Sequence, residues 1–187
     1  MVSTETPICK FGWHAPNFSL KGVDEKIHSL ESVRGESGTV IMFICNHCPY
    51  VKAIIDRLVR DIRELQTMGF GAVAIMSNDP RDYPEDTFEN MKVVSHRNGF
   101  TFPYVIDRTQ QIARAYDAVC TPDFFGFDKD LRLQYRGRLD SSKKEPGPKN
   151  ARRELFEAMC KVAKSGKGPA LQTPSMGCSI KWIGKYS

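Results

Sequence analysis

The sequence predicts an α/β fold in three layers, with a central mixed sheet flanked by helices. Two continuous apolar runs, at 39–44 and 71–76, have the composition of strands that are buried on both faces. A helical pattern of apolar residues follows each run, which indicates a βαβ unit with a right-handed crossover. A predicted β-hairpin at 124–136 and a final helix at 151–164 complete the three-layer architecture.

The first half of the chain contains three further expected elements. Short strand-like runs on either side of a turn at 22–25 predict an N-terminal hairpin over about 16–31. The first core helix is expected to start near Pro49, because proline is tolerated in a first turn, and to end at Gly69. A second helix is expected from about 84 to 98, where acidic residues of the first turn suit the positive end of a helix.

The second half of the chain is predicted to continue with short elements. A strand is expected at 103–107 and a helix at 110–118. Asn150 is the candidate N-cap of the final helix. The C-terminal tail, about 166–187, carries isoleucine and tryptophan side chains that are costly to expose, so it is expected to pack on the domain.

Length and composition indicate one domain spanning 1–187. The chain has 187 residues, 41% of them hydrophobic, which suits a substantial core and argues against disorder. The first residues lack a basic region followed by an apolar stretch, and no segment approaches the ~20 apolar residues of a membrane span. We therefore expect a cytoplasmic protein without a membrane partner. Its six cysteines are too few for a disulfide-stapled scaffold.

The charge of the chain is positive and unevenly distributed. The formal net charge is +5, and the basic excess lies after about residue 129. A nucleic-acid surface would be expected to show interleaved aromatic residues or a known binding motif, and neither is present. We expect no nucleic-acid partner; an acidic protein partner fits the charge as well as a solvated face does.

The motif Cys45-Asn46-His47-Cys48 stands where the first buried strand gives way to a helix. Two cysteines at this spacing can close a small disulfide, and the positive end of a helix favours a thiolate on the first sulfur. The thiolate is the form that attacks disulfides and peroxides. The alternative interpretation of a single C-x-x-C motif is half of a zinc site.

Three blocks of sequence give the chain a resemblance to a known family. They are the segments 43–51, 120–125 and 177–182, which hold the C-N-H-C-P motif, a Cys-Thr-Pro run and a Gly-Cys-Ser run. Together with the order of elements, they resemble the thioredoxin fold and more closely its peroxiredoxin-like branch, the alkyl hydroperoxide reductase/thiol-specific antioxidant family. The resemblance runs from about Pro16 to Trp182 and implies a three-layer thioredoxin-like (peroxiredoxin-like) fold.

The resemblance also implies roles for the residues around the cysteine pair. Thr121 and Pro122 match the loop whose cis-proline faces the two sulfurs in thioredoxin-fold proteins, and X–Pro bonds are the usual place for a cis peptide. The expected catalytic residues are Cys45 as the attacking thiolate, Cys48 as the resolving thiol and His47 as a group that lowers the pKa of Cys45. The expected substrate-facing residues are Thr121, Pro122, Asn46 and Pro49, and the candidate accessory thiols are Cys120 and Cys178.

The sequence departs from both branches of the family at activating positions. Peroxiredoxins carry P-x-x-x-T-x-x-C, and here the proline and threonine positions hold Gly38 and Met42 when the motif is aligned on Cys45. The position beside Pro122 where an arginine is expected offers an acidic and an aromatic residue instead. Thioredoxins carry a buried aspartate six residues before the first cysteine, where this chain has Thr39. No proton acceptor for the second cysteine is therefore evident from the sequence.

Three functions remain open at this level. The favoured one is a thiol–disulfide oxidoreductase that acts on protein or small-molecule disulfides and thiols through a C-x-x-C pair. A peroxiredoxin-like thiol peroxidase would direct the same nucleophile at hydroperoxides. The third is a non-enzymatic protein-binding or metal-holding module, with zinc on Cys45 and Cys48 beside Cys120 or Cys178. For the favoured function we expect no cofactor and no metal, and the oligomeric state is left open.

Overall fold

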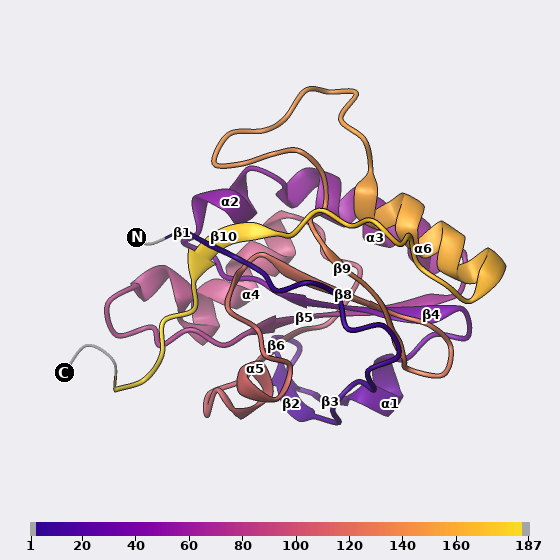
Figure 1. Ribbon diagram of the computed structural model, residues 1–187. Coiled ribbons are helices and arrows are strands. Elements are labelled where there is room, and N and C mark those ends of the chain that lie inside the picture. The colour runs from indigo at the N-terminus through magenta and orange to yellow at the C-terminus, as the bar shows by residue number, and fades with distance from the viewer. Residues whose placement is uncertain (1–2, 185–187) are drawn as a thin grey trace.

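The computed structural model describes residues 3–184 and has a mixed β-sheet at its centre, with helices on both faces (Figure 1). Within that range the sheet has seven strands. In spatial order they are β3 (Ile27–Ser29), β2 (Ser19–Gly22), β6 (Tyr104–Ile106), β5 (Phe70–Met76), β4 (Gly38–Phe43), β8 (Asp123–Phe127) and β9 (Leu133–Gly137). Strands β4, β5 and β6 are parallel, whereas β8, β9, β2 and β3 each run antiparallel to a neighbour. The predicted α/β fold with a central mixed sheet is confirmed.

The central strand β4 divides its side chains between two apolar layers, because successive side chains of a strand point to opposite faces. Val40 and Met42 join the layer under the first group of helices, and Ile41 and Phe43 join the layer on the opposite face. The first group comprises α2 (Pro49–Lys52), α3 (Ile55–Thr67), α4 (Phe88–Arg97) and α6 (Glu154–Ser165). The opposite face is covered by α1 (Leu30–Val33) and α5 (Gln111–Ala115). No helix within 3–184 is long and apolar enough to cross a membrane.

The helix predicted to run without interruption from Pro49 is divided into two. Between α2 and α3 the amide of Ile54 bonds to the carbonyl of Val51 at 3.1 Å, three residues back, which tightens the chain into a turn. The apolar spacing that predicted one helix continues across this break, since Ile54 is 4% exposed and belongs to the core. The short α2 therefore follows the cysteine motif directly, and α3 packs on the apolar layer that contains Val40 and Met42.

The other two helix starts also differ from the sequence prediction. The segment predicted as one helix at 84–98 is a 3-10 turn, η1 (Pro84–Asp86), followed by α4 after an extended Thr87. The final helix begins with Arg153 as its N-cap rather than Asn150. The Arg153 guanidinium pairs with Asp61 and Glu64 of α3, both at 2.8 Å, so a tertiary contact decides where this helix begins.

The two ends of the described chain meet in a second, smaller sheet. Its strands, in spatial order, are β1 (Ser3–Glu5), β10 (Met176–Ser179) and β7 (Cys120–Thr121). Figure 1 shows β10, in yellow, lying beside β1, in indigo. The tail therefore packs on the domain through β10 and as far as Trp182: Ile180 is 2% exposed, whereas Leu171 and Ile183 are exposed. The part of the predicted tail at 185–187 lies outside the described residues.

Candidate active site

The cysteine motif lies at the junction between the central sheet and α2. Cys45 follows β4 by two residues, and Cys48 is the N-cap of α2, with Pro49 as the first helical residue. Both sulfur-bearing residues are buried, with exposed fractions of 1% for Cys45 and 0% for Cys48. A buried strand that ends at a helix start thus holds the two thiols inside the fold.

The loop at Thr121-Pro122 contacts both sulfurs. The peptide bond between these residues is cis. The hydroxyl of Thr121 lies 3.1 Å from the Cys45 Sγ, and the Thr121 carbonyl accepts a hydrogen bond from the Cys48 Sγ at 3.1 Å. The resemblance implied a substrate-facing Thr121, but here its side chain and carbonyl are directed at the cysteine pair.

A third thiol completes the cluster. Cys178 on β10 lies opposite Thr121 in the antiparallel pairing of β10 with β7. Its Sγ is 3.1 Å from the Cys48 Sγ. The structure therefore brings one of the two candidate accessory thiols into direct contact with the C-x-x-C pair. The other, Cys120, directs its Sγ to the Pro122 carbonyl at 3.6 Å, and burial raises its pKa.

A buried carboxylate that the sequence analysis did not single out organises the start of the motif. Asp86, at the end of η1, is 0% exposed. Its Oδ1 accepts the backbone amides of Asn46 at 2.8 Å and His47 at 3.1 Å, and its Oδ2 accepts His47 Nδ1 at 2.6 Å and Asn78 Nδ2 at 2.9 Å. Burial raises the pKa of Asp86, but the bonds from His47 and Asn78 outweigh that effect and leave it lowered. Asp86 is therefore an ionised acceptor.

These contacts change the expected electrostatics of Cys45. The sequence analysis expected the positive end of a helix to favour a Cys45 thiolate, but the Asn46 and His47 amides next to Cys45 bond to Asp86. Burial raises the pKa of Cys45 well above its ordinary value, and the neighbouring Cys48 and Asp86 raise it further, whereas the Thr121 hydroxyl lowers it. The expectation that the fold lowers the pKa of the first sulfur is wrong for this reduced, buried state.

The negative charge is favoured on the second sulfur instead. Hydrogen bonds from the Cys178 and Cys45 thiols lower the pKa of Cys48, and the backbone amides of Cys178 and Val51 add to the effect against the opposing effect of burial. The Val51 amide belongs to the first turn of α2, so the positive end of that helix acts on Cys48. Cys48 thus lies between two other thiols, and it is the sulfur of the pair whose pKa is lowered.

His47 lies between the cysteine and the carboxylate. Its Nδ1 is 2.6 Å from Asp86 Oδ2 and 3.6 Å from Cys45 Sγ, and an ionised carboxylate can only accept, so Nδ1 carries a proton. The ring stacks on Tyr83 with centroids 4.1 Å apart. Its Nε2 is buried and has no hydrogen-bond partner among the described residues. The close contact with Cys45 that was expected from the sequence is present, but the stronger partner of His47 is Asp86.

Two surface pockets flank this cluster. Cys45 lines one of about 290 Å³, together with Asn46 and the basic residues Lys52 and Arg97. The Asn46 side chain itself is turned inward, since it bonds to the Glu85 carbonyl at 2.7 Å and to the Tyr104 hydroxyl at 3.1 Å. Cys45 is thus the cysteine of the pair that lines this opening.

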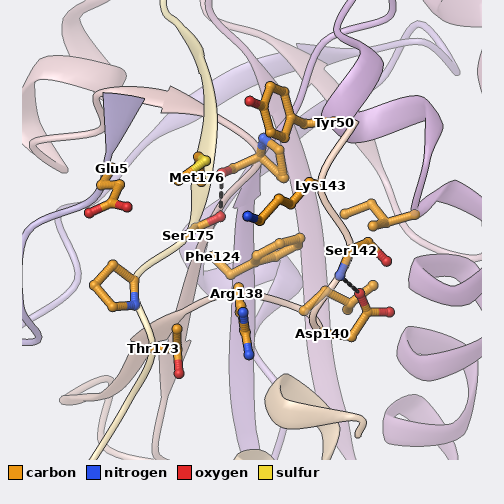
Figure 2. Close-up of a pocket in the computed structure, with 14 residues that line it drawn as sticks. Glu5, Tyr50, Phe124, Arg138, Asp140, Ser142, Lys143, Thr173, Ser175 and Met176 are labelled. Atoms are coloured by element: carbon orange, nitrogen blue, oxygen red, sulfur yellow. Dashed lines mark hydrogen bonds between the residues drawn. The ribbon is translucent and has the colours of Figure 1, made fainter. Parts of the chain in front are cut away.

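The second pocket, of about 230 Å³, lies on the side of Pro122. Figure 2 shows the Lys143 side chain reaching into it between Tyr50 and Phe124. The Ser175 hydroxyl in this pocket donates a hydrogen bond to the Pro122 carbonyl at 2.7 Å, which ties the strand before β10 to the proline loop (Figure 2). Pro122 therefore lines a pocket with both acidic and basic side chains rather than the one beside Cys45.

A metal-ligating set can also be identified. Cys45, His47 and Asp86 each offer a ligand atom, and these atoms lie within 4.8 Å of one another. This is not the set of cysteines that the zinc alternative invoked. The carboxylate already holds hydrogen bonds on both oxygens, so a metal ion would have to displace the 2.6 Å bond from His47.

Comparison with known proteins agrees with the family resemblance found in the sequence. A model of the AhpC/TSA family matches residues 11–136, well over half of the chain. The chain belongs to the AhpC/TSA family. The match includes both cysteines of the motif and the Thr121-Pro122 loop, but it ends before Cys178.

Two solved structures and one curated relative are similar to this AhpC/TSA chain. The crystal structure of a conserved protein from Geobacillus kaustophilus is 46% identical, with a TM-score of 0.92 over 100% of this chain and 98% of that one. The thiol-disulfide oxidoreductase ResA of Geobacillus thermodenitrificans is 28% identical over 131 residues, which are 70% of this chain and 71% of the relative. The thioredoxin domain of a thiol-disulfide oxidoreductase from Bacteroides vulgatus has a TM-score of 0.62 at 14% identity, over 82% of this chain and 97% of that one. The fold is thioredoxin-like.

Asp86 is the functional residue that sequence reasoning missed. Asp86 follows Pro84 and Glu85, and acidic residues are common in the first turn of a helix. The sequence analysis therefore had no reason to assign Asp86 to the site. Only the folded structure, in which η1 lies against the motif, shows that the Asp86 carboxylate accepts the amides of Asn46 and His47, 40 and 39 positions earlier.

Proposed function

We propose that the protein is a thiol–disulfide oxidoreductase that works through the Cys45–Cys48 dithiol/disulfide pair. The observation that carries the proposal is the position of the two sulfurs, which lie together between a helix start and the Thr121-Pro122 loop, with Cys45 facing a surface pocket. The names of a curated relative and of a fold neighbour, both thiol-disulfide oxidoreductases, support the same class. The substrates are disulfides and thiols of proteins or small molecules.

The first step follows from access and charge. Cys45 lines the pocket, whereas Cys48 is completely buried and has the lowered pKa. When a substrate disulfide reaches Cys45, the Cys45 thiol releases its proton to water in the pocket, and the Cys45 thiolate attacks one substrate sulfur. A bond forms between Cys45 and that sulfur, and the other substrate sulfur leaves as a thiolate.

The second step depends on the lowered pKa of Cys48. After the first step Cys48 gives up its proton easily, because its surroundings favour the thiolate. The thiolate attacks the Cys45 sulfur of the mixed disulfide, the Cys45–Cys48 bond forms, and the second substrate sulfur leaves. The substrate disulfide is reduced to two thiols and the cysteine pair is oxidised; a dithiol reductant reverses the process on the protein.

Peroxide reduction is less well supported by the contacts of the site. A thiol peroxidase needs preorganised donors for the charge that develops on peroxide oxygen. The buried Arg136 is bonded to Asp123 at 3.0 Å and to the Asp117 carbonyl at 2.6 Å, so its guanidinium is not directed at Cys45. The Thr121 hydroxyl is the donor nearest to that sulfur. We therefore place thiol–disulfide exchange first.

The test is to trap the mixed disulfide. Cys48→Ser should accumulate mixed disulfides through Cys45 when incubated with a protein disulfide, and Cys45→Ser should trap none of that protein disulfide. Cys160→Ser on α6, whose sulfur lies 3.9 Å from the Met68 sulfur and far from the pair in the fold, is the matched control and should behave as the native chain does. Trapping through Cys48 in Cys45→Ser, with turnover retained, would invert the roles.

A further inference from the structure

Cys48 has two sulfur neighbours, and only one of them belongs to the C-x-x-C motif. Its Sγ interacts with the Cys45 thiol and lies 3.1 Å from the Cys178 Sγ. A covalent S–S bond is about 2.05 Å long, so a movement of about 1 Å would bring the Cys48 and Cys178 sulfurs to bonding distance. Cys178 lies 130 residues after Cys48 and beyond the part of the chain that the family model matches.

The backbone around Cys178 holds this contact in place. Strand β10 is paired on one edge with β1 and on the other with β7, where Cys178 is opposite Thr121. The preceding Gly177 makes the close approach possible, because a Cβ at that position would lie 2.0 Å from the Thr121 carbonyl oxygen. The same Thr121 contacts Cys45 and Cys48. One residue therefore fixes the relative positions of all three thiols.

We propose that Cys178 is a third redox-active thiol, which exchanges with the Cys45–Cys48 disulfide to give a Cys48–Cys178 disulfide. This inference rests on the proposed function for the first disulfide. It assigns Cys178 a chemical role that the C-x-x-C motif does not contain.

The exchange balances within the chain. The Cys178 thiolate attacks the Cys48 sulfur, the Cys48–Cys178 bond forms and the Cys45–Cys48 bond breaks. Cys45 leaves as a thiolate and takes up the proton that Cys178 released. One disulfide and one thiol are present before and after the step, so no external oxidant or reductant is required.

The charges around Cys178 suit this step. In the reduced site, its contact with Cys48 is the first cause that raises the pKa of Cys178, and burial is the second. A Cys48 that is already in a disulfide carries no charge, so the first cause is absent when Cys178 has to react. Lys181 and Lys144 lower the pKa of Cys178 and remain in place in either state.

The exchange has a consequence for access to the site. It moves the disulfide from the pocket that Cys45 lines to the inner position beside β10, and it returns Cys45 to the pocket as a thiol. An oxidised molecule should then still present an alkylatable Cys45. A protein that forms the Cys45–Cys48 disulfide alone would not.

The experiment maps disulfides in two forms of the full chain after oxidation by excess oxidised glutathione. The first form is the native chain, alkylated with iodoacetamide, digested without reduction and analysed by mass spectrometry. We expect at least about a tenth of the oxidised molecules to carry both a Cys48–Cys178 link and an alkylated Cys45. This fraction corresponds to a tenfold preference for the Cys45–Cys48 disulfide, which is a difference of about 30 mV in reduction potential for a two-electron couple. The absence of this species in the native chain would overturn the proposal.

The second form, Cys45→Ser, shows whether the inner bond can form alone. Glutathione disulfide should convert its Cys48 and Cys178 into a link with release of two glutathione thiols, and Cys45→Ser/Cys160→Ser should do the same. Cys45→Ser/Cys178→Ser should stop at a glutathione adduct. If Cys45→Ser does not fold, the map of the native chain decides. A link in both forms without turnover of any substrate disulfide would refute the proposed function and leave the Cys48–Cys178 bond established.

Discussion

Replacing Asp86 by asparagine tests how the site controls the reactivity of Cys45. The carboxylate lies within 4.8 Å of the Cys45 sulfur and raises its pKa. At that separation two unit charges interact by about 0.9 kcal/mol at a dielectric constant near 80 and about 3.5 kcal/mol near 20. Asp86→Asn removes this repulsion and should therefore lower the pKa of Cys45.

The same substitution should destabilise the fold. Asparagine can keep the bonds from the Asn46 and His47 amides, but its NH2 group then faces the donors His47 Nδ1 and Asn78 Nδ2. A hydrogen bond to a charged group contributes about 1.5–3 kcal/mol, so we expect a loss of about 2–4 kcal/mol in the free energy of unfolding. Because the folded pKa of Asp86 lies below the ordinary 3.8, its contribution is fully present above that pH and is lost as the pH falls through the folded value. The difference between variant and native chain should shrink in that acid range.

Two measurements check these expectations. The rate of Cys45 alkylation by iodoacetamide, followed against pH on the Cys45 peptide, reports the pKa. Urea unfolding at several pH values reports stability. Asp82→Asn makes the same charge change at an exposed position nearby and is the control. An alkylation pKa that is unchanged or higher in Asp86→Asn would refute the electrostatic account of Cys45.

Three further outcomes are expected. His47→Ala should raise the pH at which Cys45 reacts, because the Asp86 charge loses the imidazole partner at 2.6 Å; alkylation profiles that coincide with those of the native chain would contradict this. Reaction of the native protein with H2O2 should be slow in stopped-flow measurements, and a rate constant orders of magnitude above that of a free thiolate would reverse the order of the two enzyme functions. Arg136→Met should lower the free energy of unfolding by about 3–5 kcal/mol, because it leaves the Asp123 carboxylate buried without its cation. Adding Asp123→Asn should recover part of that loss, and no recovery would show that lost packing rather than charge is responsible.

Much of the architecture follows from patterns within a few residues of one another. The apolar run at 39–44 and its neighbour at 71–76 predict buried parallel strands, and both are central in the sheet. The C-x-x-C motif between strand and helix, and a Thr121-Pro122 loop beside it, are also apparent without coordinates. Helix boundaries were less well predicted: the break after α2 and the start of α6 depend on a tightened turn and on the ion pairs of Arg153, and neither has a local signal.

The fold class and the position of the cysteine motif could be predicted from the amino-acid sequence, and the family resemblance is confirmed by the family match. The difference in pKa between the two sulfurs of the motif depends on tertiary contacts. It arises from Asp86, which accepts the backbone amides of Asn46 and His47, and from Cys178, which reaches Cys48 from 130 residues away. The pKa of a thiol is set by every charge, donor and buried surface within a few ångströms. Sequence patterns report neighbours along the chain, whereas these neighbours are brought together by the pairing of β10 with β7 and by the closing of η1 over the motif.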